Sequence, residues 1–423
     1  MVCFLGDSIT HDGLFHRYIY DYYLTRFTDR RIRFANAGVA GDSASGVQIR
    51  LIEDVIDKKP TSVAIMFGLN DMNRSLYVSA PDARILAEQQ TALDGFRRNL
   101  AHTANRVRTE AGDPRLIFLT PTLFDHTMAG SPDNNQPGCN AGVGRCAEIT
   151  AAIAGLHNAA CVNFHGPMTA FNAERQQRDP FDTIIGPDRV HPGPEGHLVM
   201  AWIFLTAQQV PSLVSRVSVD AKSGQVTECA NATVSHLANR DDRWLFRLQQ
   251  QALPFPMDEH ARTALTESLI ARDVNEERVA IGGLPSGRYE LLIDEVGMGT
   301  YAASELAEGI DLAGNTVTPQ YRQAQAVATV NAQRHTTEKT LRNYAAVRWF
   351  LTHCQVNPDD TTAVSAFYQA TTNKNGYFEF QIPTYLENWS KRGLLIAQVA
   401  DLEQQLFALR QPVEHTYIIR PLP

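Results

Sequence analysis

MVCFLGDSIT, residues 1–10, is a short apolar run that ends at Gly6 and is followed at once by Asp7 and Ser8. Val2–Leu5 is typical of a buried strand. Helical periodicity follows over Leu14–Phe27, which carries several aromatic side chains. The chain therefore opens with a strand, a sharp turn and a helix, which is the repeating unit of an α/β fold.

The same alternation of strand and helix continues to about residue 210. Parallel strands with helices between them form a sheet that is covered by helices on both faces, and ligands bind at the carboxyl ends of its strands. We therefore predict an α/β fold with its site in the loops that begin at Gly6, Gly38, Gly68 and Pro121. The predicted strands are Arg31–Ala37, Ser62–Phe67, Leu116–Thr120 and Ala160–Phe164, and the predicted helices are Gly46–Lys58, Pro81–Thr109, Ala141–His157 and Gly196–Gln208.

After about Pro211 the pattern changes to short strands with turns between them. A long helical segment covers about 318–354, and His415–Arg420 is a closing strand that we expect to complete the sheet of this region. We predict two domains, an α/β domain at 1–211 and an accessory α+β domain at 212–423. The polar residues of the second region do not converge on a recognisable site, so we interpret it as a structural or specificity-tuning module.

Composition excludes several classes of protein. Hydrophobic residues make up 44% of the chain and charged residues 20%, which are ordinary globular values. The net charge of −8 disfavours nucleic acid as a partner, because an acidic chain repels phosphate. No apolar run is long enough to span a membrane. The first residues lack the basic and apolar regions of a signal peptide, and we leave the compartment and the oligomeric state open.

The six cysteines do not form a disulfide framework in a chain of this length. Cys3 and Cys161 lie in apolar strand-like runs, and we expect both to be reduced core residues. Cys139 and Cys146 lie in a Gly- and Asn-rich stretch that we interpret as a loop, and whether they pair stays open.

Ser8 is the first candidate nucleophile. A serine at a sharp turn between a strand and a helix presents its Oγ at the edge of the sheet, and the helix start directs N–H groups at negative charge. The alternative is a plain helix cap. Gly41-Asp42-Ser43 repeats the same tripeptide in a loop of small residues. There we expect the Gly41 N–H to be an oxyanion donor and Ser43 to cap the following helix.

Two further loops carry polar groups suited to such a site. Asn70, in Gly68-Leu69-Asn70-Asp71, offers an amide that can donate to an oxyanion, although Asn is also an ordinary turn residue. Asp188 and His191 stand three residues apart, so the carboxylate can reach the Nδ1–H of the ring while Nε2 faces a nucleophile. A surface turn is the alternative for this pair.

Taken together, the four loops indicate a serine hydrolase site more specifically than any one of them does. With these four motifs in this order, the sequence resembles the SGNH hydrolases, also called GDSL esterases or lipases. Gly6 to Thr10 matches the nucleophile block of that family, and Asn36 to Gly41 matches its glycine block. Gly68 to Asp71 matches the asparagine block, and Asp188 to His191 matches the Asp-x-x-His block. The resemblance covers about residues 1–210. The second region resembles, more weakly, accessory parts of bacterial relatives that act on carbohydrates.

The resemblance implies a flavodoxin-like three-layer sandwich and hydrolysis of esters or thioesters without a metal. It implies Ser8 as nucleophile, His191 as base and Asp188 as the residue that orients it. It also implies the Ser8 N–H, the Gly41 N–H and the Asn70 amide as oxyanion donors.

We expect no cofactor, because the sequence has neither the glycine loops of nucleotide sites nor the HExxH or CxxC spacing of metal sites. The polar loops predict a short-chain carbohydrate esterase, most simply an O-deacetylase, with a small-molecule or glycan ester as substrate. A lysophospholipase or thioesterase of the same fold is the alternative enzyme, and a carbohydrate-binding pseudoenzyme is the alternative outside enzymes.

Overall fold

The architecture comes from a computed structural model of the 423-residue chain, which describes residues 1–129, 136–257, 261 and 270–423. These residues form two compact units, each drawn from three stretches of the chain. Unit 1 comprises Met1–Arg17, Arg33–Phe204 and Arg334–Ala400, and unit 2 comprises Tyr18–Ile32, Leu205–Gln333 and Asp401–Pro423. The units do not coincide with the division that we predicted after residue 211, because residues 334–400 pack with the N-terminal sheet.

Unit 1 is built on a parallel sheet of five strands in the order β2-β1-β3-β4-β5. Gly6 of β1 pairs with Gly38 of β2 and with Met66 of β3, so the carboxyl ends of these strands are level. This strand order is that of flavodoxin-like folds, and the predicted α/β fold is confirmed. The strands are β1 Val2–Gly6, β2 Phe34–Gly38, β3 Ser62–Met66, β4 Arg115–Leu119 and β5 Ala160–Val162.

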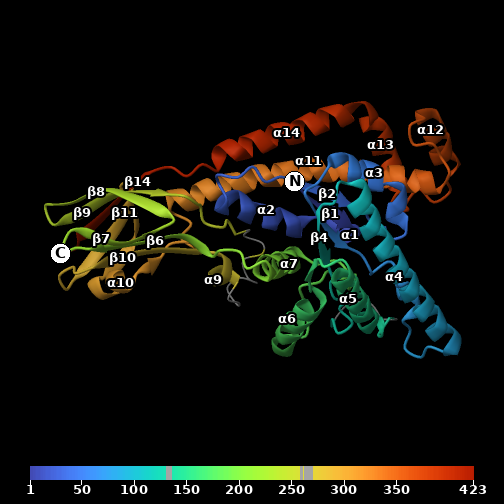
Figure 1. The fold of residues 1–423 in the computed structure, drawn as a ribbon, viewed down its shortest axis with the longest axis horizontal. Helices are drawn as coiled ribbons and strands as arrows, with labels where there is room; N and C mark the ends of the chain where they lie inside the picture. Colours follow the sequence, from blue (N-terminus) through green and yellow to red (C-terminus); the bar gives the residue numbers. More distant parts are fainter. Residues whose placement is uncertain (130–135, 258–260, 262–269) are drawn as a thin grey trace. The chain divides into compact units, whose positions relative to one another are not determined.

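Helices account for most of the rest of unit 1, and α4 and α5 contact each other (Figure 1). The predicted helix at 46–58 is instead divided into three short pieces, and α6 was not predicted. The helices that begin in this unit are α1 Ser8–Asp12, α2 Leu14–Arg26, η1 Gly46–Ile49, α3 Leu51–Asp54, η2 Ile56–Lys58, η3 Arg74–Leu76, α4 Ala83–Glu110, α5 Cys139–Leu156, α6 His165–Arg178, α7 Pro194–Ala207, α12 Thr361–Ala370, η5 Glu379–Gln381, α13 Ile382–Asn388, η6 Trp389–Lys391 and α14 Arg392–Leu409.

The C-terminal half of α11 (Pro319–His353) covers the β2 edge of the sheet. Strand β2 is an edge strand, so some of its backbone groups lack a neighbouring strand. Glu338 Oε1 accepts the Asn36 N–H at 2.8 Å, and Arg342 Nε donates to the Gly38 carbonyl at 3.0 Å. Two side chains one helical turn apart thus take the place of the missing strand.

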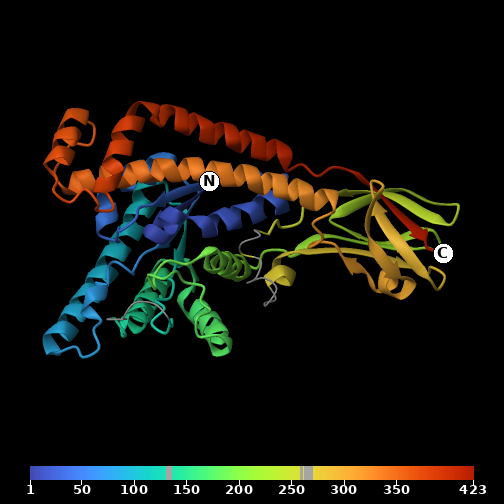
Figure 2. The ribbon, with the colours of Figure 1, turned by 180° about the vertical axis from the view of Figure 1, so that it is seen from behind.

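Helices α12 and α13 fold back at the C-terminal end of α11, as both views of the ribbon show (Figures 1 and 2). Their apolar side chains pack with those of α11 in a separate core cluster. Residues 334–400 therefore add a helical layer with its own core to unit 1. The buried members of this cluster are Tyr344, Val347, Leu351, Val364, Ile382 and Tyr385.

Unit 2 contains two sheets, ordered β13-β10-β6-β7 and β12-β11-β14-β9-β8. Alternate residues of the central strands point into one apolar cluster, for example Val217 and Val219 of β6 and Tyr417 and Ile419 of β14. Strand β14 pairs antiparallel with both β11 and β9, so the last strand lies inside its sheet. The remaining elements are β6 Leu213–Asp220, β7 Gln225–Ala230, β8 Ala232–Arg240, β9 Arg243–Gln250, α9 Ile270–Val274, β10 Glu276–Gly282, β11 Arg288–Ile293, β12 Val296–Ala302, α10 Ala303–Glu308, β13 Ile310–Asp311 and β14 His415–Pro421.

The cysteines differ from expectation at two points. Cys3 is buried as predicted, but Cys161 is exposed, because β5 is a three-residue strand at the edge of the sheet. Cys139 and Cys146 are both buried and free, and they lie in helix α5 rather than in a loop. Seven residues of helix separate them by about 10 Å along the axis, which is beyond the reach of a disulfide.

Candidate active site

Ser8 begins helix α1 immediately after β1. The turn between them is tight, since a Cβ on Gly6 would lie 2.3 Å from Thr10 Oγ1 and 2.7 Å from the Met66 carbonyl oxygen. Asp7 caps the helix by accepting the Ile9 N–H at 3.1 Å. The capping role thus falls to Asp7, and the side chain of Ser8 is left at the carboxyl edge of the sheet.

Asp188 and His191 lie on one turn just before α7. The Oδ1 atom of Asp188 accepts the N–H groups of Val190 and His191, each at 3.0 Å. The Gly186 N–H donates to the His191 carbonyl at 2.7 Å and closes the turn. These bonds fix the carboxylate and the ring relative to each other.

The structure brings the three predicted residues together. His191 Nε2 lies 2.8 Å from Ser8 Oγ, and His191 Nδ1 is hydrogen-bonded to Asp188 Oδ2. A carboxylate only accepts, so Nδ1 carries the proton and Nε2 presents a lone pair to the Ser8 hydroxyl. About half of the surface of the His191 and Asp188 side chains is exposed, so a substrate can reach them.

Asp188 is suited to hold that tautomer. Burial raises the pKa of this carboxyl, but hydrogen bonds from the His191 ring and from the two backbone N–H groups outweigh burial, and the net pKa is lowered. Asp188 therefore remains ionised and accepting at neutral pH.

The three predicted oxyanion donors lie at the same edge of the sheet, Ser8 at the start of α1 and Gly41 and Asn70 on loops. Val39 N–H donates to the Gly6 carbonyl at 3.1 Å, which holds the Gly41 loop against the end of β1. Gly41 has φ +76°, a left-handed conformation that favours glycine. Within the part of the chain that the structure describes, neither the Ser8 N–H nor the Gly41 N–H has an acceptor. Both are free to donate to a ligand.

Asn70 is held beside this loop by one of its two amide hydrogens. Its Nδ2 donates to the Asp42 carbonyl at 2.8 Å, which leaves the second hydrogen for another acceptor. Asp42 is itself fixed, because its carboxylate accepts from Arg50 Nε at 2.7 Å and is fully buried. The position of Asn70 therefore depends on the conformation of the glycine loop.

Asp71 supports the same loop from the other side. Its Oδ1 accepts the Ala44 N–H at 2.9 Å, and its Oδ2 is buried without a hydrogen-bond partner among the described residues. Burial raises the pKa of Asp71 to about 7, and the neighbouring carboxylates of Asp7 and Asp42 add to the rise. Burial likewise raises the pKa of Asp7 to about 6.

Ser43, in the repeated tripeptide, takes another role. Its Oγ accepts the Gly46 N–H at 3.1 Å, at the start of η1. Its hydroxyl also lies 2.9 Å from Ser45 Oγ. The Ser43 hydroxyl is thus engaged at a helix start, while His191 is bonded to Ser8.

His11 and Asn343 are site residues that the sequence did not predict. His11 Nδ1 accepts the Ala40 N–H at 3.1 Å, so its Nε2 carries the proton and donates to Asn343 Oδ1 at 2.8 Å. Burial lowers the pKa of His11 to about 4, with a further lowering from the charge of Arg342, so the ring stays neutral. His11 thereby ties the glycine loop to helix α11. No local sequence signal marks a contact between residues 332 positions apart.

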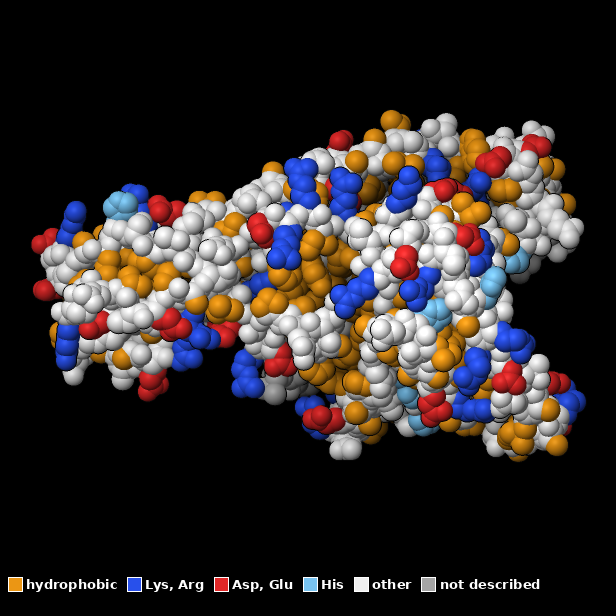
Figure 3. Space-filling view, in the orientation of Figure 1, with side chains coloured by type: hydrophobic (Ala, Val, Ile, Leu, Met, Phe, Trp, Pro, Cys, Tyr) orange, Lys and Arg blue, Asp and Glu red, His pale blue; other side chains and the backbone are white. Residues whose placement is uncertain are grey.

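The described residues show neither a metal-ligand cluster nor a membrane helix. No three His, Cys, Asp or Glu side chains in these ranges lie together as metal ligands would. None of the described helices combines the length and apolar character needed to cross a membrane. Basic and acidic side chains are interspersed over the face drawn in Figure 3.

Comparison with known proteins shows which family the α/β domain resembles. Residues 4–199 match the GDSL-like lipase/acylhydrolase family. The chain is 26% identical over 217 residues to an acetylxylan esterase of Geobacillus stearothermophilus. This aligned segment covers 48% of this chain and 90% of that protein. It also resembles the solved structure of a gut microbial diltiazem-metabolizing enzyme, with 27% identity and a TM-score of 0.92, over 100% of this chain and 97% of the other. Residues 4–199 therefore form a hydrolase domain of the GDSL-like lipase/acylhydrolase, or SGNH, family.

Proposed function

We propose that this hydrolase is a serine esterase that removes short acyl groups, above all acetyl, from carbohydrate esters. The observation that carries the proposal is the run of hydrogen bonds from Ser8 through His191 to Asp188 at the carboxyl edge of the sheet. The similarity to an acetylxylan esterase supports acetyl as the acyl group and a carbohydrate as the alcohol.

In the first half-reaction, Ser8 Oγ attacks the carbonyl carbon while His191 Nε2 takes the hydroxyl proton. The carbonyl oxygen becomes an oxyanion that accepts from the Ser8 N–H, the Gly41 N–H and the free amide hydrogen of Asn70. The tetrahedral intermediate collapses, the bond to the alcohol oxygen breaks, and the imidazolium gives its proton to that oxygen. Asp188 stabilises the charge on the ring throughout.

In the second half-reaction, a water molecule replaces the alcohol. His191 Nε2 takes a proton from the water as its oxygen attacks the acyl carbon. The same three donors hold the second oxyanion. The bond between the acyl carbon and Ser8 Oγ then breaks, the carboxylic acid leaves, and the imidazolium returns its proton to Ser8 Oγ, so the enzyme is restored.

The expected preference for short acyl chains follows from the loops around the site. Residues 38–46 and 70–75 are rich in small and polar side chains. An apolar acyl pocket would gain about 0.8 kcal/mol for each buried CH₂ and would make kcat/KM rise with chain length. Without such a pocket, a longer acyl chain gains no free energy of burial, and its extra methylene groups are crowded at the oxyanion site.

A panel of p-nitrophenyl esters from acetate to octanoate tests the proposal, together with acetylated xylo-oligosaccharides and diltiazem. We expect acetate to be preferred, butyrate to be weaker and octanoate to be nearly inert. A preference for octanoate would instead favour a lysophospholipase. Labelling by a fluorophosphonate, mapped to the peptide that contains Ser8, separates an enzyme from a binding protein; absence of labelling would argue for a pseudoenzyme.

A further inference from the structure

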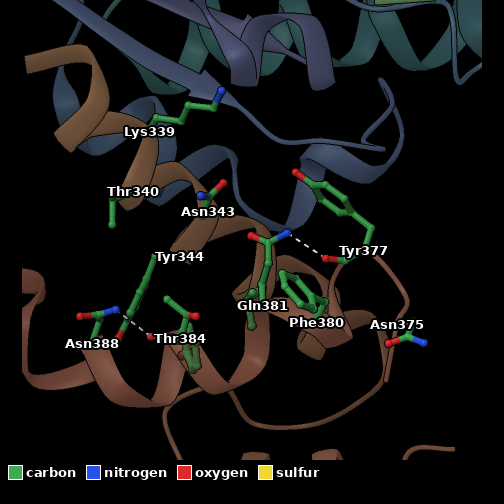
Figure 4. Close-up of a pocket in the computed structure, with 12 residues that line it drawn as sticks. Lys339, Thr340, Asn343, Tyr344, Asn375, Tyr377, Phe380, Gln381, Thr384 and Asn388 are labelled. Carbon is green, nitrogen blue, oxygen red and sulfur yellow. Dashed lines mark hydrogen bonds between the residues drawn. The ribbon is translucent and has the colours of Figure 1, made fainter. Parts of the chain in front are cut away.

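Residues 339–388 of unit 1 enclose a pocket of about 630 Å³, drawn in Figure 4. Its volume is within the range of small-molecule sites. Its wall combines aromatic rings with amide and hydroxyl groups. Lys339 is the one charged lining residue among those described, and its ammonium is paired with Asp12. The wall therefore suits an uncharged ligand.

Two amide groups in the wall have hydrogen-bonding capacity left. Gln381 Nε2 donates to the Tyr377 carbonyl at 2.8 Å, while its Oε1 is buried with no partner among the described residues. Figure 4 shows this oxygen turned away from Tyr377, toward the side on which Asn343 lies. Asn343 uses its Oδ1 on His11, and its Nδ2 finds no acceptor in the described ranges. An unsatisfied buried acceptor costs free energy that a ligand hydroxyl would recover.

Two aromatic rings at the pocket are exposed to solvent. Phe380 is 72% exposed and Tyr377 is 55% exposed. Exposed apolar surface around a groove commonly marks a ligand site. Flat aromatic faces pack against the C–H faces of a sugar ring, whose hydroxyls project sideways to donors and acceptors. Rings combined with spare amides match that chemistry.

The pocket adjoins the candidate active site through two contacts. Phe378, between the lining residues Tyr377 and Phe380, has its Cζ 3.7 Å from the position of a Cβ on Gly41. Asn343 is bonded to His11, which lies in the same short helix as Ser8. The helical layer that forms the pocket therefore contacts the glycine loop and helix α1.

We propose that this pocket binds the neutral oligosaccharide chain that carries the acetyl group, so that residues 334–400 form a glycan subsite of the esterase. This inference rests on the proposed function for its choice of ligand. Chain length beyond the acetylated sugar then contributes to binding through Phe380, Tyr377 and Gln381.

The first experiment measures binding without catalysis. The full-length Ser8→Ala protein is titrated with unacetylated xylotetraose by calorimetry. Phe380→Ala and Gln381→Leu are then introduced separately into this background, with Leu394→Ala as control, since Leu394 is 71% exposed in α14 and does not line the pocket. We expect saturable binding that each pocket variant weakens about tenfold and that Leu394→Ala leaves unchanged. No saturable binding, or equal affinity in all three variants, overturns the inference.

The second experiment separates the subsite from the function. Both substitutions are also introduced into the enzyme that retains Ser8. The quantity measured is kcat/KM for acetylated xylotetraose divided by kcat/KM for p-nitrophenyl acetate. We expect Phe380→Ala and Gln381→Leu each to lower this ratio about tenfold. If the wild type hydrolyses both substrates and neither variant changes the ratio, the subsite is refuted and the esterase proposal stands. If the wild type fails on acetylated xylotetraose while Ser8→Ala still binds xylotetraose through Phe380, the subsite stands and the carbohydrate function is refuted.

Discussion

Replacing Arg342 with methionine tests whether helix α11 is an essential part of the hydrolase unit. Arg342 donates to both carboxylate oxygens of Asp54, at 2.7 and 2.8 Å, and to the Gly38 carbonyl at 3.0 Å. Both side chains are nearly inaccessible, with 5% and 7% of their surface exposed. Methionine fills a similar volume without the charge, so the change removes the bonds and creates little cavity.

The size of the effect follows from what remains around Asp54. Its carboxylate keeps one bond from Arg50 at 2.7 Å but loses two charge-assisted bonds from Arg342. Breaking a buried ion pair by removing one partner costs about 3–5 kcal/mol, since the other charge stays buried. For a unit of this size, such a loss lowers the midpoint of thermal unfolding by about 6–20 °C.

Thermal unfolding followed by circular dichroism at neutral pH measures this shift. The matched control is Arg84→Met, which removes an ion pair to Glu88 on the exposed face of α4. Such a pair contributes at most about 0.5 kcal/mol, so the control should unfold within about 2 °C of the wild type. Equal midpoints for Arg342→Met and Arg84→Met would refute the reasoning that α11 seals the sheet edge.

Four further outcomes are expected. Ser8→Ala should lower kcat for p-nitrophenyl acetate by several orders of magnitude, whereas Ser43→Ala should stay close to the wild type; the reverse result would identify the wrong serine. Asn70→Ala should lower kcat roughly 10²–10³-fold with little change in KM, and a change confined to KM would show a role in substrate binding alone. Burial raises the pKa of Asp71 from 3.8 to about 7, so this group contributes stability below pH 4 that is lost as the pH rises through 7. Asp71→Asn should therefore raise the unfolding midpoint at pH 8 and leave it unchanged at pH 4, and an equal shift at both values would contradict the assignment. A chain ending at residue 211 should not give a soluble active enzyme, and a monodisperse active product in size-exclusion chromatography would show that residues 334–400 are dispensable.

The sequence alone indicated the α/β fold and the position of the candidate site. Strand, turn and helix patterns are local, and the carboxyl ends of parallel strands must share one edge, so the loops at Gly6, Gly38 and Gly68 were expected to converge. The Asp188–His191 pair could be predicted for the same reason, because its geometry is set within one turn.

The tertiary structure alone decided which later residues join that unit. Glu338 accepts from a backbone group 302 positions earlier in the chain, and Arg342 pairs with Asp54 across 288 positions. On a helix, a Glu and an Arg one turn apart are typical of a solvent-exposed ion pair, so their burial against an edge strand leaves no local signal. Cys161 shows the same limit, because an apolar run indicates a strand but not whether that strand lies at the edge of its sheet. The pocket beside Gly41 likewise depends on how residues 334–400 pack on the sheet. The physical reason is the same in each case, because edge pairing and burial are properties of the assembled fold rather than of any one segment.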